Sequence, residues 1–344
     1  MKSVYVSDLH DGDSVDELFL VVSKSTGATR AGAPFIKCNL SDKTGAIQAV
    51  KWDATPEEIE SFSEADYIKV RGKVGSFNGQ PQLRLDSFYK YIDEADSSDF
   101  LPVTHYSTDE MLTEFRRLID KVKNPQLRQL LACFFDDERT MHSFKEAPAA
   151  IRVHHAYLGG LLEHTLNVVK TCDLLSTIYT DVDRDILLTA ASLHDIGKLQ
   201  EYDWSSAFRF TDTGHFVGHV VGGAMMVKEA ADSIEGFDPL LNLAMQHAIL
   251  SHHGLKEYGS PKQPKSLEAM IVHFADELDA DAAMYHNALA DASNDNDSSL
   301  FTKKHFFLDR PLFKGMPQPD DASNKEFDSD LFSAERGIDP FADD

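Results

Sequence analysis

The pattern of hydrophobic and polar positions divides the 344-residue chain into a strand-like first part and a helical remainder. Up to residue 92, short apolar or alternating runs predict five β-strands. Turn sequences such as SDKTG and FNGQ separate neighbouring runs, and the acidic, helix-like segment PEEIESFSEADY precedes the fourth. The predicted strands are residues 17–23, 35–40, 46–52, 67–74 and 82–89. Five short strands of this kind predict a small barrel.

From residue 108 onward, apolar residues recur at helical spacing. One helix is predicted to begin at Thr108, and Asn124-Pro125 separates it from a second helix that ends at Phe135. The chain is therefore predicted to be a multidomain α+β protein. Its predicted parts are a barrel domain at 1–92, a linker with connecting helices at 93–138, a helical bundle at 139–290 and a disordered acidic tail at 291–344.

Charge and composition narrow the classes of function. The net charge of −24 opposes broad electrostatic attraction to nucleic acid, so a polyanion must be held by local basic or aromatic side chains or by bound metal. No apolar run approaches the ~18 residues that span a bilayer, and the N-terminus lacks the pattern of a secretion signal. The scattered Cys38, Cys133 and Cys172 are interpreted as free thiols, so we expect a cytoplasmic protein that binds no membrane.

A series of histidines and aspartates is the strongest chemical signal in the sequence. Most of its members lie in apolar, helix-like segments, which would carry them into the interior. Several imidazoles with a carboxylate that can bridge suit one or two borderline divalent ions better than calcium. The series predicts a buried divalent-metal site. Its members are His164, His194, Asp195, His219, His252, His253 and Asp276.

Two ions bridged by a carboxylate can activate a water and clamp a phosphoryl group, and Asp195 is the expected bridge. Lys198, one turn beyond His194, is a candidate phosphate contact, with a salt bridge to Glu201 as the alternative. His155 is a further catalytic candidate.

Other polar residues near the series have competing interpretations. His155 and the adjacent His154 either reach the scissile phosphate or are structural histidines. Asp279 and Asp281 are rivals to Asp276, but we interpret them as residues that cap or solvate a helix.

The ordered series resembles the HD-domain metal-dependent phosphohydrolases, in which a His, a His-Asp pair, further His and a final Asp follow one another. Longer strings, with the barrel-like segment before them, resemble the YhaM-type 3′-5′ exoribonucleases over about residues 1–290. These strings are HHAYLGGLLEHT at 154–165, LHDIGKLQEY at 193–202, FTDTGHFVGH at 210–219, SHHGLKEYGSP at 251–261 and PKSLEAMIVHFADELDA at 264–280.

The resemblance implies how the ligands are shared and what the chain does. His164, His194 and Asp276 would complete one metal site around Asp195, and His219 with His252, or His253 in its place, would build the second. It implies a 3′-5′ exonuclease that releases 5′-mononucleotides from single-stranded RNA, with single-stranded DNA left open. Two ions are implied, with manganese or cobalt favoured, although such ligands also accept iron, nickel and zinc.

The barrel segment resembles an OB-fold, in which a single strand of nucleic acid crosses the barrel face, stacks on aromatic rings and contacts basic side chains. OB barrels also dock proteins, and Phe35 and Trp52 have the alternative of a place in the core. The candidate nucleic-acid-binding residues are Phe35, Lys37, Trp52, Arg71, Lys73, Phe77 and Arg84, with Lys51 and Gln82 also available.

Other functions stay open on the sequence alone. The acidic charge suits an HD phosphohydrolase of a small nucleotide or cyclic dinucleotide. A noncatalytic RNA-binding scaffold and a di-iron oxygenase are further alternatives. Apolar helix faces at 109–135 favour a homo-oligomer, and the acidic tail is interpreted as a docking segment for an unknown protein or as unstructured chain.

Overall fold

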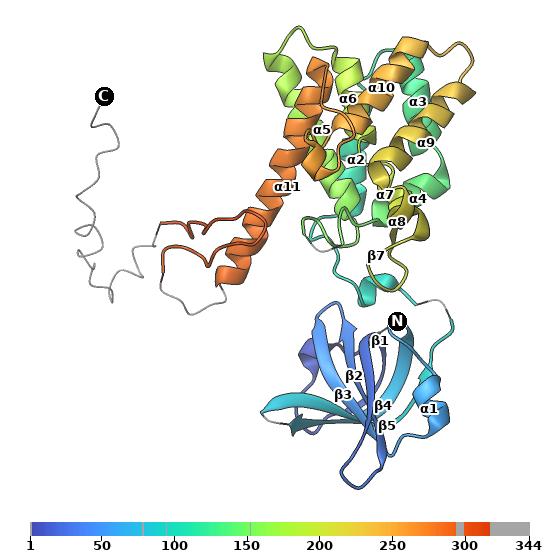
Figure 1. Ribbon diagram of the computed structural model, residues 1–344, viewed down its shortest axis with the longest axis vertical. Coiled ribbons are helices and arrows are strands. Elements are labelled where there is room, and N and C mark those ends of the chain that lie inside the picture. The colour runs from blue at the N-terminus through green and yellow to red at the C-terminus, as the bar shows by residue number, and fades with distance from the viewer. Residues whose placement is uncertain (1, 78, 94, 152, 294–298, 317–344) are drawn as a thin grey trace, which may run out of the picture. The chain divides into compact units, whose positions relative to one another are not determined.

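The computed structural model describes residues 2–77, 79–93, 95–151, 153–293 and 299–316 (Figure 1). It divides into two compact units, Met1–Ala283 and Met284–Asp344. The first unit contains a β-barrel followed in sequence by a set of helices.

Five strands close the barrel in the order β1-β2-β3-β5-β4. Neighbouring strands pair antiparallel except β3 and β5, which run parallel. A short helix, α1 (Pro56–Glu60), connects β3 to β4 and begins at Thr55, whose side chain accepts the backbone N–H of Glu58. This is the topology of the OB fold, so the predicted five-stranded barrel is confirmed. The strands are β1 (Ser14–Ala28), β2 (Pro34–Asp42), β3 (Gly45–Trp52), β4 (Tyr67–Phe77) and β5 (Gln80–Lys90).

Alternation along the strands separates a packed interior from a polar exterior. On β2, Ile36, Cys38 and Leu40 are buried, whereas Lys37 between them is exposed. Phe19 of β1 is fully buried in the same core. The positions that face outward are therefore free to carry function.

The segment before β1 is fastened to the barrel by the buried carboxylate of Glu17. One oxygen accepts the backbone N–H of Ser3 at 2.9 Å and its hydroxyl at 2.8 Å, and the other accepts the N–H of Leu18 at 2.9 Å. Burial alone would raise the pKa of Glu17, but these hydrogen bonds lower it from 4.5 to about 2.

The second part of the first unit is helical, as predicted. Between α7 and α9 the chain forms a two-stranded ribbon, β6 (Tyr202–Asp203) with β7 (Arg209–Phe210), and a short helix. The helices are α2 (Thr108–Ile119), α3 (Pro125–Phe135), α4 (Glu138–Glu146), α5 (Gly160–Ile178), α6 (Arg184–Leu193), α7 (Lys198–Glu201), α8 (Asp212–Phe216), α9 (His219–Ser233), α10 (Pro239–Ser251) and α11 (Leu267–Ser293). Three 3-10 turns, η1 (Val6–Asp8), η2 (Ser97–Asp99) and η3 (Lys256–Tyr258), complete the assignment.

Helices α2 and α3 turn their apolar faces into the helical core. Phe115 of α2, Phe135 of α3 and Phe144 of α4 are fully buried, with ring centroids 4.8 to 5.4 Å apart. The apolar faces at 109–135 thus pack largely within the chain, and the homo-oligomer stays a prediction. These helices also share one core with α5 and α6 rather than forming a separate connection.

The end of the chain is structured further than the sequence predicted. Helix α11 continues to Ser293, and residues 299–316 contain β-bridges between Phe301 and Phe313 and between His305 and Arg310. The rest of the predicted acidic tail, 294–298 and 317–344, lies outside the described residues. Among the described helices, none is long and apolar enough to cross a membrane.

We predict that Glu17→Gln weakens the barrel by about 1–2 kcal/mol at pH 7, because a neutral amide accepts hydrogen bonds less strongly than a carboxylate. The folded-state pKa lies below the unfolded value, so this stabilisation is present above pH 4.5 and is lost as the pH falls from 4.5 to about 2. Urea unfolding at several pH values, followed by Trp52 fluorescence in a Trp204→Phe background, measures both effects. Exposed Glu60→Gln is the control, and equal midpoints for Glu17→Gln and the parent at pH 7 would contradict the prediction.

Candidate functional site

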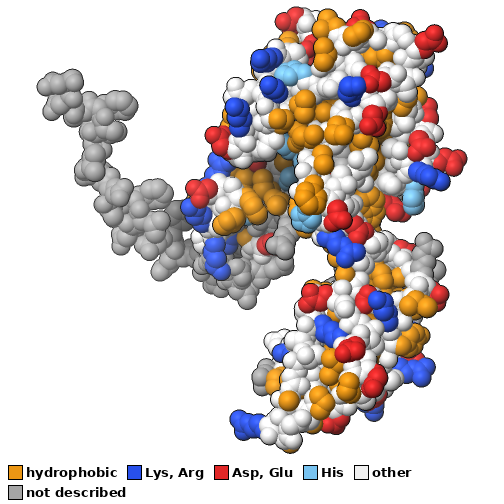
Figure 2. Space-filling view, turned by 45° about the vertical axis from the view of Figure 1, so that its right-hand side comes forward, with side chains coloured by type: hydrophobic (Ala, Val, Ile, Leu, Met, Phe, Trp, Pro, Cys, Tyr) orange, Lys and Arg blue, Asp and Glu red, His pale blue; other side chains and the backbone are white. Residues whose placement is uncertain are grey.

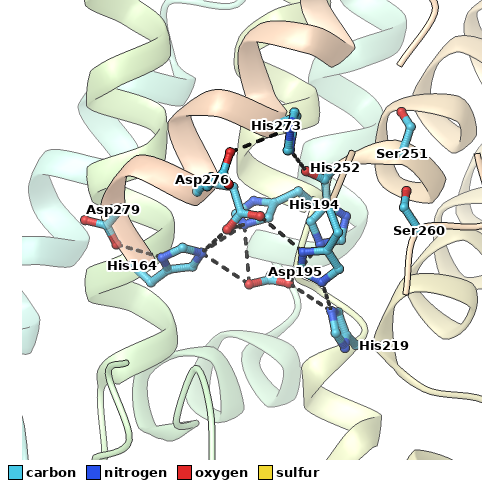
Figure 3. Close-up of polar contacts among 12 residues, drawn as sticks. His164, His194, Asp195, His219, Ser251, His252, Ser260, His273, Asp276 and Asp279 are labelled. Carbon is cyan, nitrogen blue, oxygen red and sulfur yellow. Dashed lines mark hydrogen bonds and ion pairs between the residues drawn. The ribbon is translucent and has the colours of Figure 1, made fainter. Parts of the chain in front are cut away.

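The histidines and aspartates of the series converge from separate helices of the first unit (Figure 3). His164 lies in the first turns of α5, His219 begins α9, and Asp276 lies on α11. The His194-Asp195 pair follows the last residue of α6 and lies in the turn before α7, so it is not inside a continuous helix as the sequence pattern suggested.

A first ligand group consists of His164, His194 and Asp276, all of them buried. The Nε2 atoms of the two histidines lie 3.1 Å apart. Oδ1 of Asp276 lies 3.2 Å from Nε2 of His164 and 3.9 Å from Nε2 of His194. The two Nε2 atoms and Oδ1 of Asp276 therefore lie close enough together to bind one ion.

A second ligand group consists of His219, His252 and His253. Nε2 of His219 lies 3.0 Å from Nε2 of His253, and Nδ1 of His253 lies 3.4 Å from Oδ2 of Asp276. His252 is fully buried, whereas the side chain of His253 is 26% exposed. Both His252 and His253 lie in this group, although we predicted from the sequence that one would take the place of the other.

Asp195 lies between the two groups (Figure 3). Its Oδ2 is 3.3 Å from Nε2 of His164 and 3.3 Å from Nε2 of His194. Its Oδ1 is 3.6 Å from Nε2 of His219 and 3.6 Å from Nε2 of His252. One carboxylate oxygen thus faces each group, which is the arrangement of a bridging ligand.

Backbone carbonyls fix the orientation of two of the histidines. Nδ1 of His194 lies 2.8 Å from the carbonyl oxygen of Ala191, and Nδ1 of His252 lies 2.7 Å from that of Ile249. Both carbonyls belong to the last turn of a helix, where they lack intrahelical partners. A carbonyl only accepts, so Nδ1 of each ring carries a proton, and Nε2 is the nitrogen that each ring turns toward the centre.

This centre fits divalent cations. Oδ1 of Asp195 and Nε2 of His252 are buried without a hydrogen-bond partner among the described residues, and Oδ2 of Asp195 forms an ion pair with Lys198. Burial alone would raise the pKa of Asp195, but the positive charge of Lys198 holds it well below its usual value. Burial lowers the pKa of His252 well below its usual value, which keeps the ring neutral. Anionic carboxylates beside imidazole lone pairs are the donor set of borderline metals.

Lys198 and Glu201 both lie at the centre, but they do not pair with each other, so that alternative for Lys198 was wrong. Nζ of Lys198 lies 2.6 Å from Oδ2 of Asp195. The carboxylate of Glu201 lies 2.8 Å from Nδ1 of His219 and accepts the backbone N–H of the same residue at 3.0 Å.

His155 and Asp279 form a polar chain behind His164. Nδ1 of His155 lies 2.7 Å from the hydroxyl of Tyr157, and its Nε2 lies 2.9 Å from Oδ2 of Asp279. Both ring nitrogens of His155 are therefore engaged, whereas Nδ1 of His154 is buried without a partner among the described residues.

The interpretation of Asp279 as a capping or solvated residue was wrong, because it hydrogen-bonds to His155, His164 and Asn167. Its spacing of three residues from Asp276 places both carboxylates on one face of α11, and this was the available sequence signal.

Three candidate cations form a row across the outside of the barrel. Lys37 on β2 is in register with Val50, Val50 with Arg84, and Arg84 with Lys73. The three basic side chains are exposed, and none has an ion-pair partner within the described part of the chain. Arg71 is exposed too, but its Nε lies 2.7 Å from Asp16, which neutralises its charge.

Aromatic candidates lie on both sides of this cation row. Phe35 and Trp52 are paired in register with ring centroids 5.4 Å apart, and Trp52 is 41% exposed rather than part of the core. Phe77, which is 57% exposed, lines a groove of about 300 Å³. The groove is lined by Lys37, Gln48, Phe77, Gln80, Pro81 and Gln82.

A barrel of this topology beside convergent histidines and aspartates defines an OB-fold and HD-domain protein. The HD domain model matches residues 161–281, and the model of an OB-fold nucleic acid binding domain matches residues 20–91. Over 284 residues the chain is 32% identical to the 3′-5′ exoribonuclease YhaM of Bacillus velezensis and 32% identical to that of Bacillus subtilis. Each match covers 82% of this chain and 90% of the relative. The chain belongs to the YhaM 3′-5′ exoribonuclease family.

The close approach of α9 to the His-Asp turn depends on Gly197. A Cβ at this position would lie 2.1 Å from the carbonyl oxygen of His219 and 2.6 Å from the backbone N of Gly223. We predict that Gly197→Ala displaces the start of α9, lowers stability by about 1–3 kcal/mol and reduces the divalent-metal content of the purified protein. Thermal unfolding and elemental analysis measure these effects.

Gly222→Ala is the matched control, because a Cβ there meets nothing within 4 Å and alanine favours a helix. It is expected to keep both stability and metal content. Full metal content in Gly197→Ala would contradict the role given to this close approach.

Proposed function

We propose that the chain is a metal-dependent 3′-5′ exoribonuclease that shortens single-stranded RNA from its 3′ end and releases 5′-mononucleotides. Membership of the family makes it a phosphodiester hydrolase. The observation that carries the proposal is the carboxylate of Asp195, which has one oxygen facing each of two ligand groups. Single-stranded DNA is a proposed second substrate, and manganese is the proposed ion.

Each ligand group would hold one ion, with Asp195 shared between them. When bound, two such ions supply an activated water and positive charge for the phosphoryl oxygens. Asp276 also has one oxygen toward each group, so it would hold the pair together. The backbone-anchored rings of His194 and His252 would keep their positions throughout the reaction.

Two further side chains would act on the substrate. Lys198 lies against Asp195, and we propose that it contributes positive charge beside the phosphate. Burial and Lys198 lower the pKa of His154 to about 3, so its ring is neutral and can donate or accept one hydrogen bond. We propose that His154 contacts the substrate. His155, the other candidate for this role, would act indirectly, through its contact with Asp279, which in turn contacts His164.

The barrel would hold the strand through short-range contacts. Acidic and basic side chains are interspersed on the face shown in Figure 2, so attraction must come from specific groups rather than from a broad basic surface. The cation row of Lys37, Arg84 and Lys73 lacks carboxylate partners among the described residues, and exposed Trp52 and Phe77 offer stacking surfaces. Unpaired cations and aromatic rings are the elements of a single-strand platform.

We predict that Asp195→Asn lowers the rate of RNA shortening at least about 100-fold, because the amide loses the charge shared by both ligand groups. Metal-stripped protein is given 5′-labelled single-stranded RNA with and without manganese, beside a matching DNA strand. A ladder that shortens from the 3′ end only with manganese supports the proposal.

The control for this experiment is Asp181→Asn, which removes an exposed carboxylate in the loop before α6. It is expected to shorten RNA at the parent rate. If the parent binds manganese but leaves RNA intact, the nuclease proposal is wrong, and hydrolysis of small nucleotides becomes the function to test.

We predict that Arg84→Gln weakens RNA binding and lowers the slope of log affinity against log salt by about 0.7, the value for one phosphate contact on a single strand. Arg71→Gln removes the same type of charge, already neutralised by Asp16, and is expected to leave the slope nearly unchanged. Fluorescence anisotropy with a labelled RNA at several salt concentrations measures both variants. Equal losses in the two variants would exclude the cation row as the binding surface.

A further inference from the structure

Each ligand group contains one histidine whose Nδ1 lies against a side-chain carboxylate from outside both groups. In the first group, Oδ2 of Asp279 lies 2.7 Å from Nδ1 of His164. In the second, Glu201 lies 2.8 Å from Nδ1 of His219. The other buried histidine of each group, His194 or His252, is held by a backbone carbonyl instead. Among the described histidines of the two groups, His164 and His219 are thus the ones whose Nδ1 meets a carboxylate from outside both groups, whereas Nδ1 of His253 faces Asp276.

The contact with Asp279 determines which nitrogen of His164 is free. Both oxygens of Asp279 meet donor groups, the amide of Asn167 at Oδ1 and the imidazoles of His155 and His164 at Oδ2, so the carboxylate acts as an acceptor. Nδ1 of His164 must then carry the proton, so the lone pair of the neutral ring would lie on Nε2, which faces Asp195 and Asp276. A ring held in this state is ready to bind a cation through Nε2.

The same atoms do not make Asp279 a ligand of a third ion. His155, His164 and Asp279 do bring ligand atoms within 4.8 Å of one another. However, Oδ2 of Asp279 already accepts from both imidazoles, and Oδ1 accepts from the amide of Asn167 at 2.9 Å. His164 would also have to bind through both ring nitrogens at once, because its Nε2 belongs to the first group. The contacts thus fit an orienting role.

We propose that Asp279 and Glu201 are positioning residues, and that each controls the metal affinity of its own ligand group by fixing the tautomer of His164 or His219. The inference rests on the proposed two-metal function. It adds that occupancy of the two groups is controlled separately, by two carboxylates that bind no metal themselves.

Existing hydrogen bonds predict how an amide would sit in place of either carboxylate. In Asp279→Asn, the donor Asn167 would hold the amide oxygen, so the amide NH2 would point at His164. In Glu201→Gln, the backbone N–H of His219 would hold the oxygen, so the NH2 would point at Nδ1 of the same residue. A donor facing Nδ1 favours the opposite tautomer, with a proton on Nε2 where the cation must bind.

The experiment titrates metal-stripped full-length protein with manganese and counts free ions by electron paramagnetic resonance. We expect two sites in the parent, and one of them weakened about 10- to 100-fold in Asp279→Asn. Glu201→Gln should weaken the other, so the double variant should lose affinity at both. Asp281→Asn, on the same helix, is the matched control and should bind like the parent. Circular dichroism checks that each variant is folded.

A second variant separates positioning from a general structural effect. Asn167→Ala added to Asp279→Asn frees the amide to rotate and to accept from His164 again, so the affinity should recover in part. If Asp279→Asn binds both ions like the parent, or if its loss is unchanged by Asn167→Ala, the inference is overturned. If the parent itself binds fewer than two ions, the proposed two-metal function fails instead.

Discussion

The arrangement of the helical domain depends on one electrostatic requirement: buried anionic carboxylates and imidazole lone pairs are gathered where only cations satisfy them. Asp195 is 1% exposed and Asp276 is 6% exposed, and bare nitrogens surround both. Isolated charges of this kind strongly oppose burial. Helices α6 and α10 are each followed directly by a ligand histidine. The Nδ1–H of that histidine donates a hydrogen bond to a backbone carbonyl in the last turn of the helix. One hydrogen bond thus closes the helix and orients the ligand.

In the barrel, the electrostatic constraint is the repulsion between an acidic protein and a polyanionic substrate. A chain with a net charge of −24 repels a polyanion at long range, but salt screens this repulsion beyond about 8 Å. Within that distance the local arrangement decides, and the strand register aligns Lys37, Arg84 and Lys73 in one row, with Val50 between Lys37 and Arg84. Net charge and binding surface therefore act on different length scales, and an acidic composition is compatible with nucleic-acid binding.

Periodicity and residue type predicted much of this molecule. Alternation located the five strands, helical spacing located the main helices, and the histidine and aspartate series named every member of both ligand groups. The packing of α2 and α3 against the rest of the helical core was not predictable, because the sequence of an apolar helix face does not specify which surface it contacts.

The orienting carboxylates were harder to find for a similar reason. Asp279 and Glu201 resemble ordinary helix residues, and only the tertiary fold shows which imidazole each one meets. His154 and His155 could not be separated by residue type or spacing. In the fold, His155 has a backbone φ of +49° and its ring contacts Asp279, whereas Nδ1 of His154 has no hydrogen-bond partner among the described residues.

The ligands come from α5, the turn after α6, the start of α9, the end of α10 and α11, so bound ions would cross-link segments more than a hundred residues apart in sequence. Because such a site does not exist in the unfolded chain, the free energy of metal binding adds to the free energy of unfolding. The supply of metal would then set the lifetime of the protein as well as its activity. Without bound ions the chain would unfold more often and be degraded by cellular proteases, so metal scarcity would lower the amount of the enzyme as well as its activity.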